Sequence, residues 1–530
     1  MTEVLLRPAR PDDPDVVAPG RRAAQGLRPP LLLVVPALVT AAVALVPVLY
    51  LVVRALDGGP GELADRLWRP RTLELLTRSL VLAGSVTATC LVLGVALAWL
   101  VVRSDVPWRR GWVVLAALPL AVPTYVAGFA WISFFPDLVG FRGTFVVLTA
   151  CSYPYVLLPV VAALRHLDPA GEEVARSLGL SSRQAFLRVV LPQLRPALAT
   201  GGLLVALYAL SDFGAPSIMR HDVFTRAIYT SYNASTNRQT AAVLSLVLVA
   251  VTVVLVVLEG RTRGRARYSR VGQGGARSQQ TVGLGPLRWP SLGLLAAVTT
   301  TSLGVPAAAL VYWTAKGTGD SFPGERLASA ATTSLTLAAL GAVATTVLAI
   351  PVGLLAARRA GRLPRLLEQS SYVGHALPGV VIALAMVFLF IQVDALSPLY
   401  QRTPMLVLAY VVLFLPLAVG AVHTSAAQAP PVLEEVARAS GSGPLDVLRR
   451  VTLPLAMPGI ASGAALVLLT CMKELPATLL VAPPGTATLA TRLWTETGVA
   501  SYSAAAPYAA LLVALSAVPT YLLVVRGGTR

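Results

Sequence analysis

Two carboxylates stand inside otherwise apolar stretches of this 530-residue sequence. Asp212 closes the apolar run 196–212, and Glu474 follows the run 457–472, 262 residues further along the chain. From Pro196, a helix rising about 1.5 Å per residue climbs roughly 24 Å by Asp212, toward the outer part of an apolar layer about 30 Å thick. A charge at the centre of such a layer costs about 3 kcal/mol, so each acid should face a cavity or a partner. As a symmetric pair they would offer hard oxygen ligands to a passing cation.

The neighbours of these acids support a second interpretation. Lys473 adjoins Glu474, and Arg220 follows Asp212 within a short loop, so ion pairs could hold an outer gate shut. Asp212, Glu474 and Lys473 are therefore assigned to a translocation path or gate. Transient metal contact by Asp212 and Glu474 is the alternative that remains open.

The composition predicts an all-α polytopic membrane protein. The chain is 55% hydrophobic and 13% charged, with a mean hydropathy of +0.71, whereas globular chains carry about 25% charged residues. Twelve windows are long and apolar enough to span a bilayer. These windows are 31–53, 78–102, 112–134, 144–164, 196–212, 240–258, 291–313, 333–357, 371–392, 405–425, 457–472 and 505–525.

The net charge of +18 is an orientation signal, because its arginines cluster in alternate loops, after the second, sixth and eighth spans. By the positive-inside rule these loops and both termini are cytoplasmic, and residues 1–30 form a cytoplasmic tail before an uncleaved first span. The loop 54–76, with several arginines among its acids, is an exception. This distribution favours a lipid bilayer as partner and argues against nucleic acid. The arginines that carry the signal are Arg103, Arg109, Arg110, Arg261, Arg263, Arg265, Arg267, Arg270, Arg358, Arg359, Arg362 and Arg365.

No pattern typical of an enzyme is present in the sequence. The three cysteines lack metal-ligand spacing, and the four histidines are scattered without an H-E-x-x-H pattern. The only lysines, Lys316 and Lys473, do not follow a phosphate-binding glycine loop. We therefore expect no ATP hydrolysis by this chain itself.

A polar stretch occurs twice and reveals an internal duplication. "EEVARSLGLSSRQAFLRVVLPQLRPAL" begins at Glu172, and "EEVARASGSGPLDVLRRVTLPLAMPGI" begins 262 residues later at Glu434. Prolines 123 and 378 recur at an offset of 255. Six spans per half give both halves the same orientation, so we predict two tandem parallel six-helix repeats. The predicted boundaries are 31–258 for the first repeat, 259–290 for a cytoplasmic linker and 291–530 for the second repeat.

Each polar stretch predicts two short helices joined by a sharp turn. Gly179 is placed to cap the first helix, and Ser181 with Gln184 forms a possible capping box for the next. In the second copy Gly441 takes the capping place, and Pro444 suits a first helical turn. Both stretches follow the fourth span of their repeat, which places them in the cytoplasm.

The paired stretches resemble the EAA loops of ABC importer permeases. In that family the loop is a coupling helix that docks on a cytoplasmic ATPase, so the resemblance implies two ATPase subunits, with ATP and Mg bound there and no cofactor in this chain. Val174 and Val436 replace the alanine that the family carries at the second position. The loops span 166–195 and 428–457, and the matching residues are Glu173, Ala175, Gly179, Val189, Leu191 and Pro192, then Glu435, Ala437, Gly441, Val451, Leu453 and Pro454.

The sequence motifs around the two acids resemble those of ferric-iron ABC importer permeases. They are "SDFG" with "FTRAIY" in the first repeat and "MKELPATLL" with "TLATRLW" in the second. The resemblance implies the type I ABC importer permease fold in a bacterial inner or plasma membrane, an extracytoplasmic solute-binding protein and alternating access. Thiamine permeases, which are also fused duplicates, and sulfate or molybdate permeases are alternatives. An ion-coupled secondary transporter using Asp212 and Glu474 is disfavoured, because such a carrier needs no ATPase-docking loops.

Overall fold

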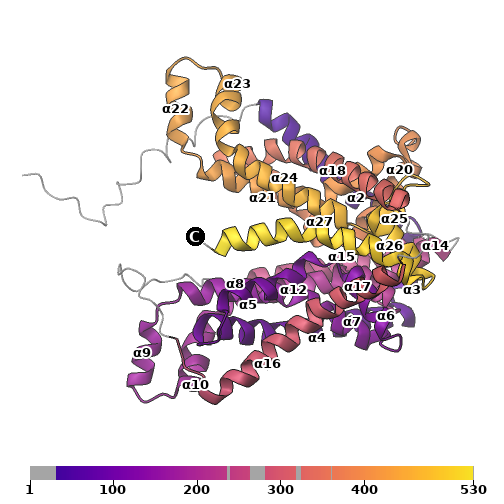
Figure 1. Ribbon diagram of the computed structural model, residues 1–530. Helices are drawn as coiled ribbons and strands as arrows, with labels where there is room; N and C mark the ends of the chain where they lie inside the picture. The colour runs from indigo at the N-terminus through magenta and orange to yellow at the C-terminus, as the bar shows by residue number, and fades with distance from the viewer. Residues whose placement is uncertain (1–30, 235–238, 263–280, 318–323, 360, 529–530) are drawn as a thin grey trace, which may run out of the picture.

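The computed structural model of the protein describes residues 31–234, 239–262, 281–317, 324–359 and 361–528. The predicted tail 1–30 and residues 263–280 of the predicted linker lie outside the described residues. The first repeat (Figure 1) contains α2 (Leu31–Leu56), α3 (Gly59–Leu67), α4 (Pro70–Arg103), α5 (Arg109–Ala117), η1 (Leu118–Ala121), α6 (Thr124–Phe134), α7 (Gly140–Ser152), α8 (Pro154–His166), α9 (Ala170–Ser177), α10 (Ser182–Ala185), η2 (Phe186–Val190), α11 (Leu191–Gln193), α12 (Arg195–Ser211), α13 (Gly214–Ile218), α14 (Phe224–Ala234) and α15 (Gln239–Thr262).

The second repeat follows the same order of long and short helices. Its elements are η3 (Gly285–Leu287), α16 (Arg288–Thr299), η4 (Thr300–Gly304), α17 (Val305–Gly317), α18 (Gly324–Arg358), α19 (Arg362–Ser371), η5 (Tyr372–Ala376), α20 (Gly379–Gln392), η6 (Ser397–Leu399), α21 (Thr403–Gln428), α22 (Pro431–Ala439), α23 (Pro444–Val447), η7 (Leu448–Thr452), α24 (Leu453–Lys473), α25 (Pro476–Val481), α26 (Leu489–Gly498) and α27 (Tyr502–Gly528). Among the described residues the only extended pairing is an isolated bridge between Ser104 and Val282.

The helices account for the predicted spans. Within the described ranges, eight helices are long and apolar enough to cross a membrane, and three bent helix pairs raise the number to eleven. The twelfth window, 505–525, falls on α27, whose segment Tyr502–Ala517 is shorter but apolar. The predicted fold class, an all-α polytopic membrane protein of tandem repeats, is confirmed.

Two of the predicted spans are sharply bent at prolines. The chain turns by 94° between Arg109–Ala121 and Thr124–Phe134, and by 102° between Arg362–Gly374 and Gly379–Gln392. The residues before Pro123 and Pro378 have extended backbone angles, as expected where a proline ring excludes the helical conformation of its predecessor. Neither window, 112–134 nor 371–392, is therefore a straight span, and α6 and α20 begin anew after the proline.

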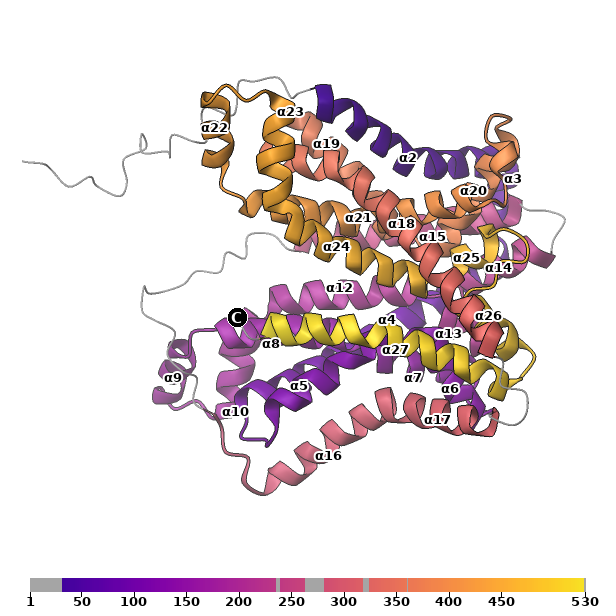
Figure 2. The same cartoon turned by 45° about the horizontal axis from the view of Figure 1, so that its top comes forward.

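The first helix of each repeat lies against the other repeat. Helix α2 packs on α18 and α20, and the Thr40 hydroxyl donates a hydrogen bond to the Leu348 carbonyl at 2.9 Å. Helix α17 packs on α6, so that α2 and α16–α17 lie on opposite sides of the molecule (Figure 2). The first helix of each repeat therefore packs against helices of the other repeat.

The two ends of the molecule differ in how the halves meet. Helices α9–α10 and α22–α23 occupy separate corners of one end, while α6, α25 and α26 gather at the other end (Figure 1). At that second end α26 contacts α6, and α14 contacts α20. The halves are thus joined at one end and held apart at the end that carries the polar repeats.

Candidate functional site

The two predicted EAA loops, 166–195 and 428–457, are called the EAA segments below. Each of them reverses direction at a glycine with a left-handed backbone conformation. Gly179 has a φ of +91° and Gly441 a φ of +87°. The amide of Gly179 donates to the Arg176 carbonyl at 3.0 Å, and that of Leu180 to the Ala175 carbonyl at 3.2 Å, which is the Schellman pattern of helix termination. The same two bonds recur at Gly441. The predicted glycine caps are confirmed.

The second short helix of each segment also begins as predicted. Ser181 and Gln184 form a reciprocal capping box, and Pro444 lies in the first turn of α23. The sequence pattern missed the π-helical turns η2 and η7, which occupy equivalent positions, 262 residues apart. A π turn holds an extra residue and rotates the side chains beyond it, so it sets which face of the segment points outward.

The matched family residues divide between surface and interior. Glu173, Gly179, Glu435 and Gly441 are exposed, whereas Ala175 is buried beneath the first turn. Ala437 and the Leu of each Leu-Pro pair, Leu191 and Leu453, are partly buried; Pro192 is partly buried as well and Pro454 is exposed. The segments also expose apolar side chains, with Val174 at 57%, Leu178 at 79% and Val436 at 56% of full exposure. This exposed apolar surface has no partner within the described chain.

A buried ion-pair network holds the second EAA segment to the bundle. The Glu434 carboxylate, 8% exposed, forms an ion pair with Arg358 at 2.9 Å and accepts hydrogen bonds from Arg438 at 3.0 Å and from the Thr452 hydroxyl at 2.9 Å. Arg358 is the last residue of α18, and it also donates to the Ala429 carbonyl at 3.0 Å. Three elements, α18, α22 and η7, are therefore joined at one carboxylate.

The first EAA segment is held by a sparser version of the same contact. Arg103 ends α4 as Arg358 ends α18, and its guanidinium lies 3.3 Å from Glu172, the equivalent of Glu434. At the position of Thr452 the first repeat has Val190, which offers no hydroxyl. The two EAA segments are thus anchored at equivalent places with unequal numbers of bonds. The EAA pattern does not include Arg103 or Arg358, and the sequence predicted them only as orientation signals, so their anchoring role was missed.

The end of the linker binds next to the first anchor. The Val282 amide donates to the Arg103 carbonyl at 2.8 Å, and the Asp105 amide donates to the Val282 carbonyl at 3.2 Å. The Asp105 carboxylate accepts from the Leu284 amide at 3.0 Å. The chain that enters the second repeat is therefore fixed to the residue whose side chain anchors the first EAA segment.

Asp212 lies at the opposite end of α12 and caps the next helix. Its carboxylate accepts from the Ala215 amide at 2.9 Å and from the Thr124 hydroxyl at 2.5 Å, and the residue is 9% exposed. Its carbonyl accepts from the Thr225 hydroxyl at 2.7 Å. Asp212 therefore joins the start of α13 to α6 and α14.

Glu474 repeats this arrangement at the end of α24. Its carboxylate accepts from the Ala477 amide at 3.0 and 3.1 Å and from the Thr478 amide at 3.2 Å, at the start of α25. Gly379 occupies the place of Thr124 in this repeat, and a Cβ there would lie 2.7 Å from Glu474. The longer acid is thus accommodated by a smaller neighbour. In a low-dielectric layer both carboxylates supply acceptors that the broken helices need.

Aromatic contacts between the repeats close this end of the molecule. Phe213, which follows Asp212 and is 2% exposed, has its ring centroid 5.2 Å from Trp494 of α26 and 4.9 Å from Tyr229 of α14. Phe129 of α6 lies 6.0 Å from Tyr502 of α27. Because Asp212 caps the turn that carries Phe213, the acid positions one side of an apolar seal.

The expected ion pairs at the gate are not formed among the described residues. Lys473 does not pair with Glu474, and Arg220 does not pair with Asp212, because both carboxylates turn toward the amides of the following helices. The Lys473 ammonium instead lies 3.5 Å from the Leu120 carbonyl of the first repeat. The described residues contain no group of three or more His, Cys, Asp or Glu side chains that could hold a metal ion. Metal contact by Asp212 and Glu474 stays a prediction.

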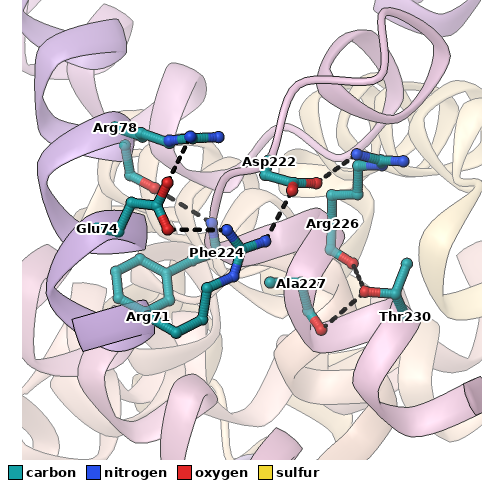
Figure 3. Close-up of polar contacts among 9 residues, drawn as sticks. Arg71, Glu74, Arg78, Asp222, Phe224, Arg226, Ala227 and Thr230 are labelled. Atoms are coloured by element: carbon teal, nitrogen blue, oxygen red, sulfur yellow. Dashed lines mark hydrogen bonds and ion pairs between the residues drawn. The ribbon is translucent and has the colours of Figure 1, made fainter. Parts of the chain in front are cut away.

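Five charged residues from α4, α14 and the loop before α14 form a network in the first repeat (Figure 3). Arg71 bridges Glu74 at 3.0 Å and Asp222 at 2.7 Å, while Arg78 pairs with Glu74 and Arg226 with Asp222. Burial by itself raises the pKa of Asp222, but the hydrogen bond from Arg71 and the nearby guanidinium charges lower it overall. Arg71, the one arginine of this network that lies in the loop 54–76, is therefore paired with two acids.

Comparison with known proteins identifies relatives of both repeats. A family model described as "Binding-protein-dependent transport system inner membrane component" matches residues 90–260 and again 349–526. The chain is 37% identical to the Fe(3+)-transport system permease protein FbpB 2 of Haemophilus influenzae, over 90% of this chain and 94% of that protein. It is 30% identical to the sulfate transport system permease protein CysW of Escherichia coli K12, over 34% of this chain and 68% of the relative. It is 26% identical to the molybdate/tungstate transport system permease protein WtpB of Thermococcus kodakarensis, over 38% of this chain and 83% of that protein.

The contacts of Glu434 outnumber those of Glu172, so we predict that neutralising Glu434 loosens its EAA segment more than neutralising Glu172 does. Glu434→Gln leaves the partly buried Arg358 without its counter-charge, and loss of one partner costs up to about 3–5 kcal/mol when both groups of a pair are fully buried. Amide hydrogen exchange in α22 should therefore accelerate strongly, with a smaller change in α9 for Glu172→Gln. Asp446→Asn, which neutralises an exposed acid on α23, is the control. Equal protection of α22 in wild type and Glu434→Gln would show that the network does not hold the segment.

Proposed function

The chain belongs to the family of binding-protein-dependent transport system inner membrane components, and on this premise we propose that it is the permease subunit of an ABC importer for ferric iron. The assignment of ferric iron as substrate rests on the similarity to an Fe(3+)-transport permease across nearly the whole of both chains. The sulfate and molybdate/tungstate relatives each cover only about one repeat. An oxyanion importer is the second candidate, favoured by the lysine at the gate.

We propose that each EAA segment docks on one cytoplasmic ATPase subunit, so that two such subunits bind ATP and Mg for this chain. The exposed valines and Leu178, together with exposed Glu173 and Glu435, give each segment an apolar surface with an acidic residue beside it. Burial of this surface against a partner would stabilise the complex. Both termini would then lie on the cytoplasmic side, where the arginine clusters gather.

The route from ATP to the gate is a pair of continuous helices in this proposal. Helix α12 runs from the first EAA segment to Asp212, and α24 runs from the second segment to Glu474. Movement of an ATPase would shift a segment, and the helix would carry that shift to the capped turn at its far end. A docked, loaded binding protein would favour the state in which the aromatic seal opens outward.

The substrate assignment is tested in vesicles that contain the permease with its ATPase and binding protein. Ferric-loaded binding protein should raise ATP turnover by about fivefold or more and drive metal uptake, a typical size for coupling between sites. The empty binding protein is the matched control. Stimulation by a sulfate-, molybdate- or thiamine-loaded binding protein, with none by the ferric form, would contradict the iron assignment.

The docking assignment is tested at the two capping glycines. Gly179→Arg and Gly441→Arg place a long cation in open space on the docking surface, and we expect ATP-driven transport to fall sharply while the membrane helices stay folded. Gly179→Ala and Gly441→Ala are matched controls, because they carry the same left-handed strain of about 1 kcal/mol without the bulk. If both arginine variants bound the ATPase and transported at the wild-type rate, the assignment would be wrong.

The gate assignment is tested by neutralising the two caps. Asp212→Asn and Glu474→Gln replace one acceptor oxygen by an NH2 group that faces other donors, at a cost of about 1–3 kcal/mol for a buried donor left unpaired. We expect higher ATP turnover without binding protein, because the closed state loses more than the open one. Asp137→Asn, at an exposed loop position, should leave turnover unchanged. Unchanged basal turnover with lost metal uptake would favour direct metal contact instead.

A further inference from the structure

Lys473 places a cation between the two repeats. It is the last residue of α24 and is partly buried, and its ammonium lies 3.5 Å from the Leu120 carbonyl of η1. Its own carbonyl accepts a hydrogen bond from the Tyr125 hydroxyl of α6 at 3.1 Å. Both contacts cross from the second repeat to the first, so the side chain faces the interface between the repeats and not the lipid.

No acid neutralises this cation within the part of the chain that the structure describes. The neighbouring Glu474 carboxylate is directed to the amides that begin α25, and Asp212 is directed to those that begin α13. An ammonium has three N–H donors, and the one contact to Leu120 is at the outer limit of hydrogen-bond length. A charge inside the membrane that lacks an internal partner indicates a functional contact.

The fold itself does not require a lysine here. In the first repeat the equivalent residue is Ser211, whose hydroxyl donates to the Tyr208 carbonyl at 3.1 Å. The equivalent of Tyr125 in the second repeat is Val380, which has no hydroxyl. Both repeats form the same broken helix, so the cation is an addition made on one side only. It is also one of only two lysines in a chain whose other cations are arginines.

We infer that Lys473 binds an oxyanion during transport, either as a ligand that travels on the metal or as a free anion. A bare trivalent cation would be repelled by this ammonium, whereas a metal whose charge is offset by phosphate-type or carboxylate-type oxygens would be attracted. Separation of the repeats at this end would remove the Leu120 carbonyl and free all three donors for such oxygens. The metal-bound form of the inference rests on the proposed ferric function, and the lysine–oxyanion contact does not.

Two lysine variants test the contact in vesicles that contain the complete complex. Uptake is measured with radioactive ferric ion and radioactive inorganic phosphate together, for wild type, Lys473→Met and Lys473→Arg. Lys473→Met keeps the length of the side chain and removes its charge, so uptake should fall about tenfold, the effect of losing one charge-assisted hydrogen bond. Lys473→Arg keeps the charge and should retain most of the uptake. Lys316→Arg, at the chain's other lysine, is the matched control and should transport at the wild-type rate.

A second measurement does not depend on transport or on any substitution at Lys473. In the Lys316→Arg protein, Lys473 is the only lysine side chain of the permease, so its reaction with an amine-acylating reagent is followed directly by mass spectrometry. In complexes held with ATP on hydrolysis-deficient ATPase subunits, inorganic phosphate should slow acylation of Lys473 about tenfold relative to chloride. Unchanged acylation, or wild-type uptake by Lys473→Met, would overturn the inference.

The radioactive label that accumulates in the vesicles shows whether the oxyanion travels bound to the metal or as a free anion. Phosphate that accumulates together with iron, both dependent on Lys473, supports a metal-bound ligand. Phosphate that accumulates without iron supports a free anion as cargo and contradicts the ferric assignment while leaving the lysine contact intact. Iron that enters without phosphate, with Lys473 unprotected by phosphate, would overturn the inference and leave the ferric assignment standing.

Discussion

A helix that begins inside an apolar layer has amide donors without acceptors in its first turn, and the arrangement of this molecule depends on how that need is met. At Asp212 and Glu474 the chain supplies a carboxylate that accepts from the first amides of the next short helix. The amides of Ala215, Ala477 and Thr478 are thereby satisfied where the helix breaks. The turn in the first repeat brings Phe213 against Trp494, so the closure between the repeats follows from a capping contact.

At the opposite end of the molecule, ion pairs hold each polar EAA segment to the helix bundle. Arg358 and Arg103 end the two longest helices of their repeats and hold the glutamates that begin the EAA segments. Helices α12 and α24 continue from those segments to the capped turns, and in the first repeat the chain bends by 68° between Ser182–Gln193 and α12. A helix of 21 residues such as α24 spans about 30 Å, enough to join the two faces of a bilayer.

Local signals predicted the local structure well. The glycines at 179 and 441, the Ser181 capping box and Pro444 act over a few residues, and each is found as predicted. The duplication also fixed the order of elements, because both copies show the same spacing. The capping role of the acids had a readable signal that was not used: Glu474 stands two residues before Pro476, which opens α25. An acid just before a helical proline is typical of a helix start.

The contacts that sequence reasoning missed join residues far apart in the chain. Arg103 and Arg358 meet glutamates about 70 residues later, and α2 packs on a helix of the other repeat. No periodicity in a single sequence encodes such pairings, since they depend on how whole helices cross. The pairing of Lys473 with Glu474 was expected from adjacency alone. It is absent because the backbone amides of α25 take up the carboxylate of Glu474.

The two repeats belong to one polypeptide chain, and the hydrogen bond from the Val282 amide to the Arg103 carbonyl fixes the end of the linker to the first repeat. In a permease built from two identical chains, one gene encodes both sides. Every substitution in that gene therefore appears on both sides of the pore. Fusion removes that restriction, and each repeat is always made in equal amount with the other. Thr452 opposite Val190, Lys473 opposite Ser211 and Gly379 opposite Thr124 are the divergence that such a gene permits. A fused gene can thus evolve a different task for each side of a pore while the architecture of both sides stays the same.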